Sequence, residues 1–194
     1  YHQDTESFSL TPAQAAVFAH EGEPTCMQGF FQAIVAQYAT HEAALQTFKS
    51  GEGRPWGEQD ACCFCGTDRF FRPGYEANLL ETWIPSLEGV DEKLTSGATV
   101  ADIGCGHGSS TIMMAKRYPN STFHGYDFHG PSIEEASQKA QASGLNNVEF
   151  QESSAKEIPD KGYDFACIFD ALHDMGDPLG AAKRIREVLA KDGT

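Results

Sequence analysis

The chain has 194 residues, 28 acidic against 14 basic side chains, and a formal net charge of −14. Its length suits one domain with a small appendage, and a hydrophobic content of 40% argues against disorder. The acidic balance disfavours tight nucleic-acid binding, which depends on neutralising phosphates. No apolar run approaches the ~20 residues that cross a bilayer, and we expect a cytoplasmic protein.

The first segment is short and partly alternating in polarity. Residues 1–10 are therefore predicted to be the last strand of a domain that lies upstream. Thr11 then begins a helix that runs to about His20. Pro12 at its first position and Gln14 at its third complete an N-terminal capping pattern.

Two more helices are predicted at 26–39 and 41–49, with Thr40 as the N-cap of the second. The first of them carries a wide apolar face, which is typical of a core or of a seam with a partner helix. That face consists of Met27, Phe30, Phe31, Ile34, Val35 and Tyr38.

Aromatic and arginine side chains then gather in one stretch, at Phe64, Arg69, Phe70, Phe71, Arg72 and Tyr75. A helix is expected at 78–84, where Pro85 stops it, and a short helix before Gly97. Residues 11–96 are therefore predicted to be all-helical.

From residue 98 strands alternate with helices, which predicts right-handed crossovers and a parallel sheet in an α/β fold. The strands are expected at 99–103, 122–127, 148–151 and 163–169, and the helices at 109–118, 131–144 and 179–190.

A glycine loop follows the first of these strands. Asp102 precedes Gly104, Gly106 and Gly108, and the loop is expected to present free N–H groups to a ligand above the strand tip. A dinucleotide fingerprint has its third glycine one residue later, where Ser109 stands. The Asp102 carboxylate would repel a pyrophosphate, whereas it suits an ammonium or sulfonium ligand.

A second acid, Asp127, ends the next strand. An acid at that tip can accept both ribose hydroxyls of a bound adenosine. A helix-capping or solvated aspartate is the competing interpretation.

The pattern Asp102-x-Gly104-x-Gly106-x-Gly108 with Asp127 resembles the first motifs of class I S-adenosylmethionine-dependent methyltransferases. The resemblance covers about residues 98–194 and implies a Rossmann-like sheet and S-adenosyl-L-methionine as cofactor. It implies cofactor contacts at Asp102, Gly104, Cys105, Gly106, Gly108, Asp127, Phe128, Ser153, Ser154 and Asp170.

The stretches Arg69–Tyr75 and Phe169–Pro178 are similar to a subgroup that has a winged-helix domain, a helical segment and a C-terminal methyltransferase domain. This resemblance implies a wing remnant at 1–10, a helical lid or dimerisation segment at 11–96, and a methyltransferase domain at 97–194. The wing remnant implies missing residues before residue 1. The methyltransferase domain has seven strands, so the sequence is interpreted as truncated at its C-terminal end as well, with its fourth strand an exposed apolar edge.

A further departure is at the third strand tip, where the family usually has an acid that contacts the adenine amino group. Ser154 stands there, which leaves a hydroxyl, a backbone group or Glu152 for that contact.

The expected acceptor side lies past the fourth strand. His173 is the candidate general base for a hydroxyl acceptor, and a packed structural histidine is the alternative. Phe70, Phe71 and Tyr75 are candidates for an apolar acceptor pocket, with Arg69 or Arg72 for an anionic acceptor; ordinary core packing is the alternative. No metal site is expected, because the Cys62-x-x-Cys65 spacing lacks a second pair.

Three functions remain open from the sequence. The first is a methyltransferase for a small molecule, with a homodimer through the helical segment. The second is a protein or RNA methyltransferase. The third is a non-catalytic cofactor-binding regulator with a winged helix.

Overall fold

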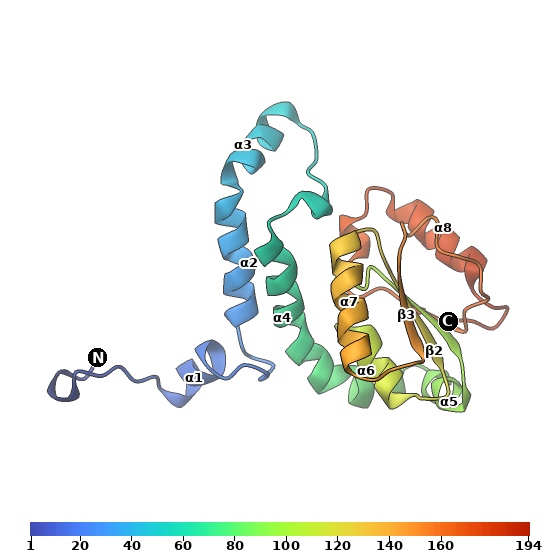
Figure 1. Cartoon of the computed structure of the whole chain (residues 1–194), viewed down its shortest axis with the longest axis horizontal. Coiled ribbons are helices and arrows are strands. Elements are labelled where there is room, and N and C mark those ends of the chain that lie inside the picture. Colours follow the sequence, from blue (N-terminus) through green and yellow to red (C-terminus); the bar gives the residue numbers. More distant parts are fainter. The chain divides into compact units, whose positions relative to one another are not determined.

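The computed structural model describes residues 1–194 and divides into two compact units (Figure 1). The first, here called the helical unit, contains Tyr1–Glu52 and Gln59–Ala77. The second, here called the sheet unit, contains Gly53–Glu58 and Asn78–Thr194. No helix in either unit combines the length and the apolar character needed to cross a membrane.

The helical unit contains a short 3-10 turn and four helices. These are η1 (Gln3–Thr5), α1 (Pro12–Phe18), α2 (Gln28–Ala39), α3 (His41–Ser50) and α4 (Ala61–Asn78), whose last residue lies in the sheet unit.

The N-terminal caps of these helices agree with the sequence only in part. Thr11 and Gln14 form the predicted capping box of α1. Thr40 is not the side-chain cap of α3, because its hydroxyl donates to the Ala36 carbonyl at 3.0 Å. The predicted strand at 1–10 is also wrong, because these residues form η1 and a single bridge between His2 and Ser7.

Helices α2 and α4 pack with their backbones in contact, and two glycines make this approach possible. A Cβ at Gly66 would lie 2.6 Å from the Ala33 nitrogen, and one at Gly29 would lie 2.7 Å from the Gly66 carbonyl oxygen. Neither helix could keep this position with a side chain at its crossing point.

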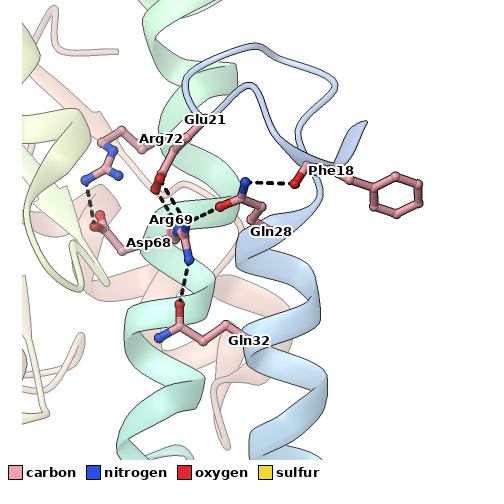
Figure 2. Close-up of polar contacts among 7 residues, drawn as sticks. All are labelled: Phe18, Glu21, Gln28, Gln32, Asp68, Arg69 and Arg72. Atoms are coloured by element: carbon pink, nitrogen blue, oxygen red, sulfur yellow. Dashed lines mark hydrogen bonds and ion pairs between the residues drawn. The ribbon is translucent and has the colours of Figure 1, made fainter. Parts of the chain in front are cut away.

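A network around Arg69 joins α4 to α2 and to the loop before it (Figure 2). The Arg69 guanidinium donates to Glu21, Gln28 and Gln32. Gln28 in turn donates to the Phe18 carbonyl at 2.9 Å, which fixes the end of α1. The hydrogen bond from Arg69 lowers the pKa of Glu21, so the pair is ionised near neutral pH.

The aromatic and arginine stretch 64–75 lies wholly within α4. Pro73 is inside this helix, although proline ordinarily ends one. The expected helix at 78–84 is instead the end of α4 followed by a π-helical turn, η3 (Leu79–Trp83).

The sheet unit has four parallel strands in the order β3-β2-β1-β4, which confirms the predicted α/β class. The strands are β1 (Thr99–Ile103), β2 (Thr122–Asp127), β3 (Val148–Glu152) and β4 (Phe165–Cys167). Its helical elements are η2 (Trp56–Glu58), η3, η4 (Ile84–Ser86), α5 (Val90–Ser96), α6 (Ser109–Arg117), α7 (Gly130–Ala142), η5 (Leu172–Asp174) and α8 (Pro178–Val188).

Strands β1 and β2 have their predicted bounds, whereas β4 is shorter than the predicted 163–169. Tyr163 forms only an isolated bridge to Leu189. The edge of β4 away from β1 is not wholly bare, because the Ala166 N–H donates to the Thr194 carbonyl and the Thr194 N–H to that of Asp164.

Helices α6 and α7 lie on one face of the sheet and α8 on the other (Figure 1). The α8 face is closed by buried apolar side chains at Ala101, Ile103, Tyr126, Ile158, Tyr163 and Val188. Two of these residues also satisfy each other's polar atoms, since the Tyr126 and Tyr163 hydroxyls are 2.7 Å apart. The packing fixes β1 beside β2, and so brings their carboxyl ends together.

Candidate functional site

The loop after β1 crosses the carboxyl end of the sheet with its glycines in the left-handed region. The φ angles are +75° at Gly104, +52° at Gly106 and +75° at Gly108, a conformation that glycine adopts without cost. Gly104 also passes under the segment after β4, since a Cβ there would lie 2.6 Å from the Ala171 Cβ. A Cβ at Gly106 would have no neighbour within 4 Å, so the loop is open at its middle.

The expectation of free N–H groups in this loop is wrong at four positions. The N–H groups of Gly104 and Cys105 both donate to the Tyr126 carbonyl, at 2.7 and 3.1 Å. Gly106 donates to Asp127 Oδ2 at 3.0 Å, and Gly108 donates to the Cys105 carbonyl at 2.9 Å. Because these four N–H groups already donate within the protein, they are not available to bind a pyrophosphate. This is a further argument against a dinucleotide ligand.

Asp102 is almost completely buried, with 1% of its surface exposed. Its Oδ2 accepts hydrogen bonds from Ser110 Oγ at 2.8 Å and Thr111 Oγ1 at 2.7 Å, whereas its Oδ1 has no partner. Burial raises the pKa of this carboxyl, and hydrogen bonds with Thr111, Ser110 and the Cys167 thiol oppose that shift. A buried carboxylate oxygen without a donor is costly, and a cationic group at the loop would compensate it.

Ser110 and Thr111 were not among the predicted site residues. Both are buried in the first turn of α6, where their hydroxyls reach Asp102 of β1. The signal that would have found them is a run of hydroxyl residues that opens the helix after the glycine loop, eight and nine positions past Asp102.

Asp127 is at the predicted place, the end of β2, and is 8% exposed. Besides Gly106, it accepts the N–H of His129 at Oδ1, at 2.9 Å. It therefore holds the backbone between β2 and α7, but it is not a helix cap, because α7 has no side-chain cap hydrogen bond at its N-cap His129. A carboxylate has about four acceptor sites, so two remain for ribose hydroxyls.

Three other predicted residues come directly after the ends of β2 and β3. Phe128 is half exposed and lies against Gly57 of η2. The Ser153 N–H donates to the Asp127 carbonyl, and the Ser154 hydroxyl donates to Glu157 Oε2 at 2.7 Å. The Ser154 hydroxyl proton is thus used within its own turn, and only its acceptor side is left for an adenine amino group.

Past β4, Asp170 and His173 lie together on an exposed turn. Asp170 has a φ of +53°, an uncommon conformation for a residue with a side chain. His173 Nδ1 is 3.7 Å from Asp170 Oδ1, and its Nε2 is 3.4 Å from Asp174 Oδ1. The ring is 62% exposed and is not packed in a core.

The three predicted acceptor-pocket residues belong to the helical unit, not to the sheet unit that holds the predicted cofactor residues. Phe70 packs edge-on against Phe71, and Phe71 stacks with Tyr75. Arg69 is neutralised by Glu21, and Arg72 pairs with Asp68 at 3.6 Å (Figure 2). An anionic acceptor would therefore have to displace an existing ion pair.

The cysteines next to the site are buried thiols. Burial raises the pKa of Cys105 and of Cys167 well above the usual range, so neither is a thiolate near neutral pH. Cys167 is paired with Asp102 in the β1–β4 register.

The structure thus has a parallel sheet whose first strand is followed by a glycine loop. One acid lies near the end of that strand and a second acid ends the next strand. Class I methyltransferase domains have this arrangement. The comparisons agree with that class. A protein-family model described as "Methyltransferase domain" matches residues 94–194, which is about half of the chain, and the chain belongs to this family.

Two curated relatives are partly similar. (S)-Coclaurine N-methyltransferase of Thalictrum flavum subsp. glaucum is 25% identical over 135 residues, covering 69% of this chain and 36% of the relative. The uncharacterized methyltransferase YcgJ of Bacillus subtilis is 31% identical over 96 residues, covering 48% of this chain and 37% of the relative. The chain thus spans less than half the length of either.

A solved structure from Methanococcus maripaludis, assigned to the S-adenosyl-L-methionine-dependent methyltransferases, has the same fold. Its TM-score is 0.59 at 20% identity, covering 73% of this chain and 64% of that one.

Proposed function

We propose that this protein transfers a methyl group from S-adenosyl-L-methionine to a small-molecule acceptor. The observation that carries the proposal is the unpartnered Oδ1 of buried Asp102, below a glycine loop whose own donors are used. This site offers acceptors and negative charge. It suits a ligand with a cationic amino-acid end and not one with phosphates.

Each end of the cofactor then has residues suited to it. Asp102 Oδ1 would take the ammonium group, and the open backbone at Gly106 would receive the chain beside it. Asp127 would take the ribose hydroxyls, with Phe128 as an apolar surface for the base. When bound, the cofactor supplies a methyl group on a sulfonium, an excellent leaving group, so the protein mainly positions and desolvates.

His173 is proposed as the base for a hydroxyl acceptor. It lies beyond the end of β4, at the sheet edge where ligands of open α/β folds bind. The carboxylates of Asp170 and Asp174 flank its two ring nitrogens and would orient the ring and stabilise its charged form after proton transfer.

A small molecule is favoured over RNA because the net charge is −14. (S)-Coclaurine N-methyltransferase, one of the partial relatives, bears the name of a small-molecule acceptor. Turnover with a panel of small hydroxyl and amine acceptors tests this choice. Methylation of RNA or protein but of no small molecule would reverse it, and cofactor binding without any turnover would favour the winged-helix regulator.

We also propose that a second copy of the chain covers the apolar face of α2. Side chains that a core would bury are exposed there, among them Val35 at 61% and Tyr38 at 75%. Light scattering should give the mass of a dimer for the wild-type chain and of a monomer for Val35→Glu. A wild-type monomer would refute the dimer.

A further inference from the structure

A short turn from far upstream in the sequence packs beside the expected adenosine end of the site. This turn is η2, Trp56–Glu58, and it belongs to the sheet unit. A Cβ at Gly57 would lie 3.4 Å from Phe128 Cε2 and 3.6 Å from His129 Cδ2. Figure 1 shows this segment, between α3 and α4, next to the start of α7.

The turn is closed by its own hydrogen bonds. The Glu58 N–H donates to the Pro55 carbonyl at 3.0 Å, and the Arg54 guanidinium donates to the Glu58 carbonyl. These bonds hold the half-buried Trp56 next to Gly57 and present the turn to the β2 tip as a formed structure.

The surface opposite the turn is apolar and directly follows the ribose acid. Phe128 is 51% exposed although its neighbour Asp127 is 8% exposed. Gly57 lets the backbone approach this ring, and any larger side chain at Gly57 would occupy the space beside the ring. Flat bases bind between aromatic and apolar surfaces of this kind.

We propose that the Trp56–Glu58 turn is a wall of the adenosine subsite, and that Gly57 decides whether the base of the cofactor fits beside Phe128. This inference rests on the proposed function and deepens it. It makes a segment outside the family's sheet part of the cofactor site.

The test is calorimetric titration of the whole chain with S-adenosylhomocysteine, comparing Gly57→Leu with Gly53→Leu. Gly53 is a matched control because a Cβ there meets nothing within 4 Å, and neither glycine has a positive φ. Gly57→Leu should weaken binding by about tenfold or more, and Gly53→Leu should leave it unchanged. Equal affinities for the two variants, with equal melting temperatures, would overturn the proposal.

A second measurement decides the matter if Gly57→Leu does not fold. The chain has two tryptophans, so Trp83→Phe leaves Trp56 as the only indole. S-adenosylhomocysteine should then change the fluorescence of Trp56. Binding by calorimetry without any change in emission would refute the wall while the proposed function stands; absence of binding to the wild-type chain would refute both.

Discussion

Asp102 destabilises the free protein, and we propose that the same residue binds the cofactor. Its Oδ1 is buried without a donor, and its charge is opposed by burial and by the nearby Asp127 carboxylate. Groups of this kind persist where a ligand provides what the protein lacks. We therefore expect Asp102 to lower the stability of the free protein and to raise its affinity for the cofactor.

Asp102→Asn should separate these two effects. The amide oxygen can still accept from Ser110 and Thr111, while the buried charge disappears. We expect unchanged or higher thermal stability at neutral pH, with affinity for S-adenosylhomocysteine lower by ~1–3 kcal/mol. Melting and calorimetry on the one variant measure both. A large loss of stability with unchanged affinity would assign Asp102 a purely structural role.

Thr111→Val should make cofactor binding more sensitive to acid. The Thr111 hydroxyl lowers the pKa of Asp102, so its removal raises that pKa further above the usual range. Because the ammonium group binds the ionised carboxylate, affinity falls as pH drops through the raised pKa, and this fall should move to higher pH in the variant. Calorimetric titrations of both proteins over a series of pH values locate it. Thr111→Ser keeps the hydroxyl and should behave as wild type; the same shift in both variants would contradict the assignment.

His173→Ala should lower turnover on a hydroxyl acceptor by ~10²–10⁴-fold, the usual effect of losing a general base. Affinity for S-adenosylhomocysteine should not change, since the ring lies past β4 and not at the β1 and β2 tips. The exposed ring makes a loss of stability unexpected. A lower melting temperature together with weaker cofactor binding would instead identify a structural residue.

At the scale of elements, the α2–α4 crossing depends on two glycines that the sequence pattern did not single out. Gly66→Ala should destabilise the helical unit by ~1–3 kcal/mol, because the new methyl group would lie 2.6 Å from backbone. Gly74→Ala in the same helix meets nothing within 4 Å and should stabilise by ~0.5–1 kcal/mol. Chemical denaturation of both variants gives the comparison. Equal effects would show that the crossing is looser than described.

The strands and helices after residue 98 could be predicted because their signals are local. Strand β1 is a mostly apolar run that ends at a glycine loop, β2 ends in an acid, and Asp177 caps α8 through the Gly180 N–H. Helix α4 could not be delimited, because Pro73 reads as a stop and the tertiary packing overrides it. β4 was predicted too long, because an apolar run does not show where pairing ends.

The candidate site also has a part that could be predicted from the sequence and a part that could not. Asp102, the glycines and Asp127 follow from spacing, since parallel strands end at one edge of a sheet. Two other features could not be predicted from spacing, because they join residues from different elements. They are the hydrogen bonds from Ser110 and Thr111 to Asp102, and the approach of Gly57 to Phe128. The same holds for the loop's N–H groups. Two of them, at Gly104 and Cys105, donate to the Tyr126 carbonyl only because the fold places the loop beside β2.

On the scale of the whole molecule, the chain consists of a sheet unit that holds every predicted cofactor residue and a helical unit that holds the predicted acceptor-pocket residues. Membership of the methyltransferase-domain family concerns the first of these. The second carries the exposed apolar face of α2 and the Arg69 network, so the proposed dimer is tested by variants of the helical unit.

The most direct test of the central claim is a calorimetric titration of the chain with S-adenosylhomocysteine and, separately, with NAD. We predict micromolar binding of S-adenosylhomocysteine, weakened by ~1–3 kcal/mol in Asp127→Ala because ribose hydroxyls lose their acceptor, and no binding of NAD. Tight binding of NAD with no binding of S-adenosylhomocysteine would contradict it.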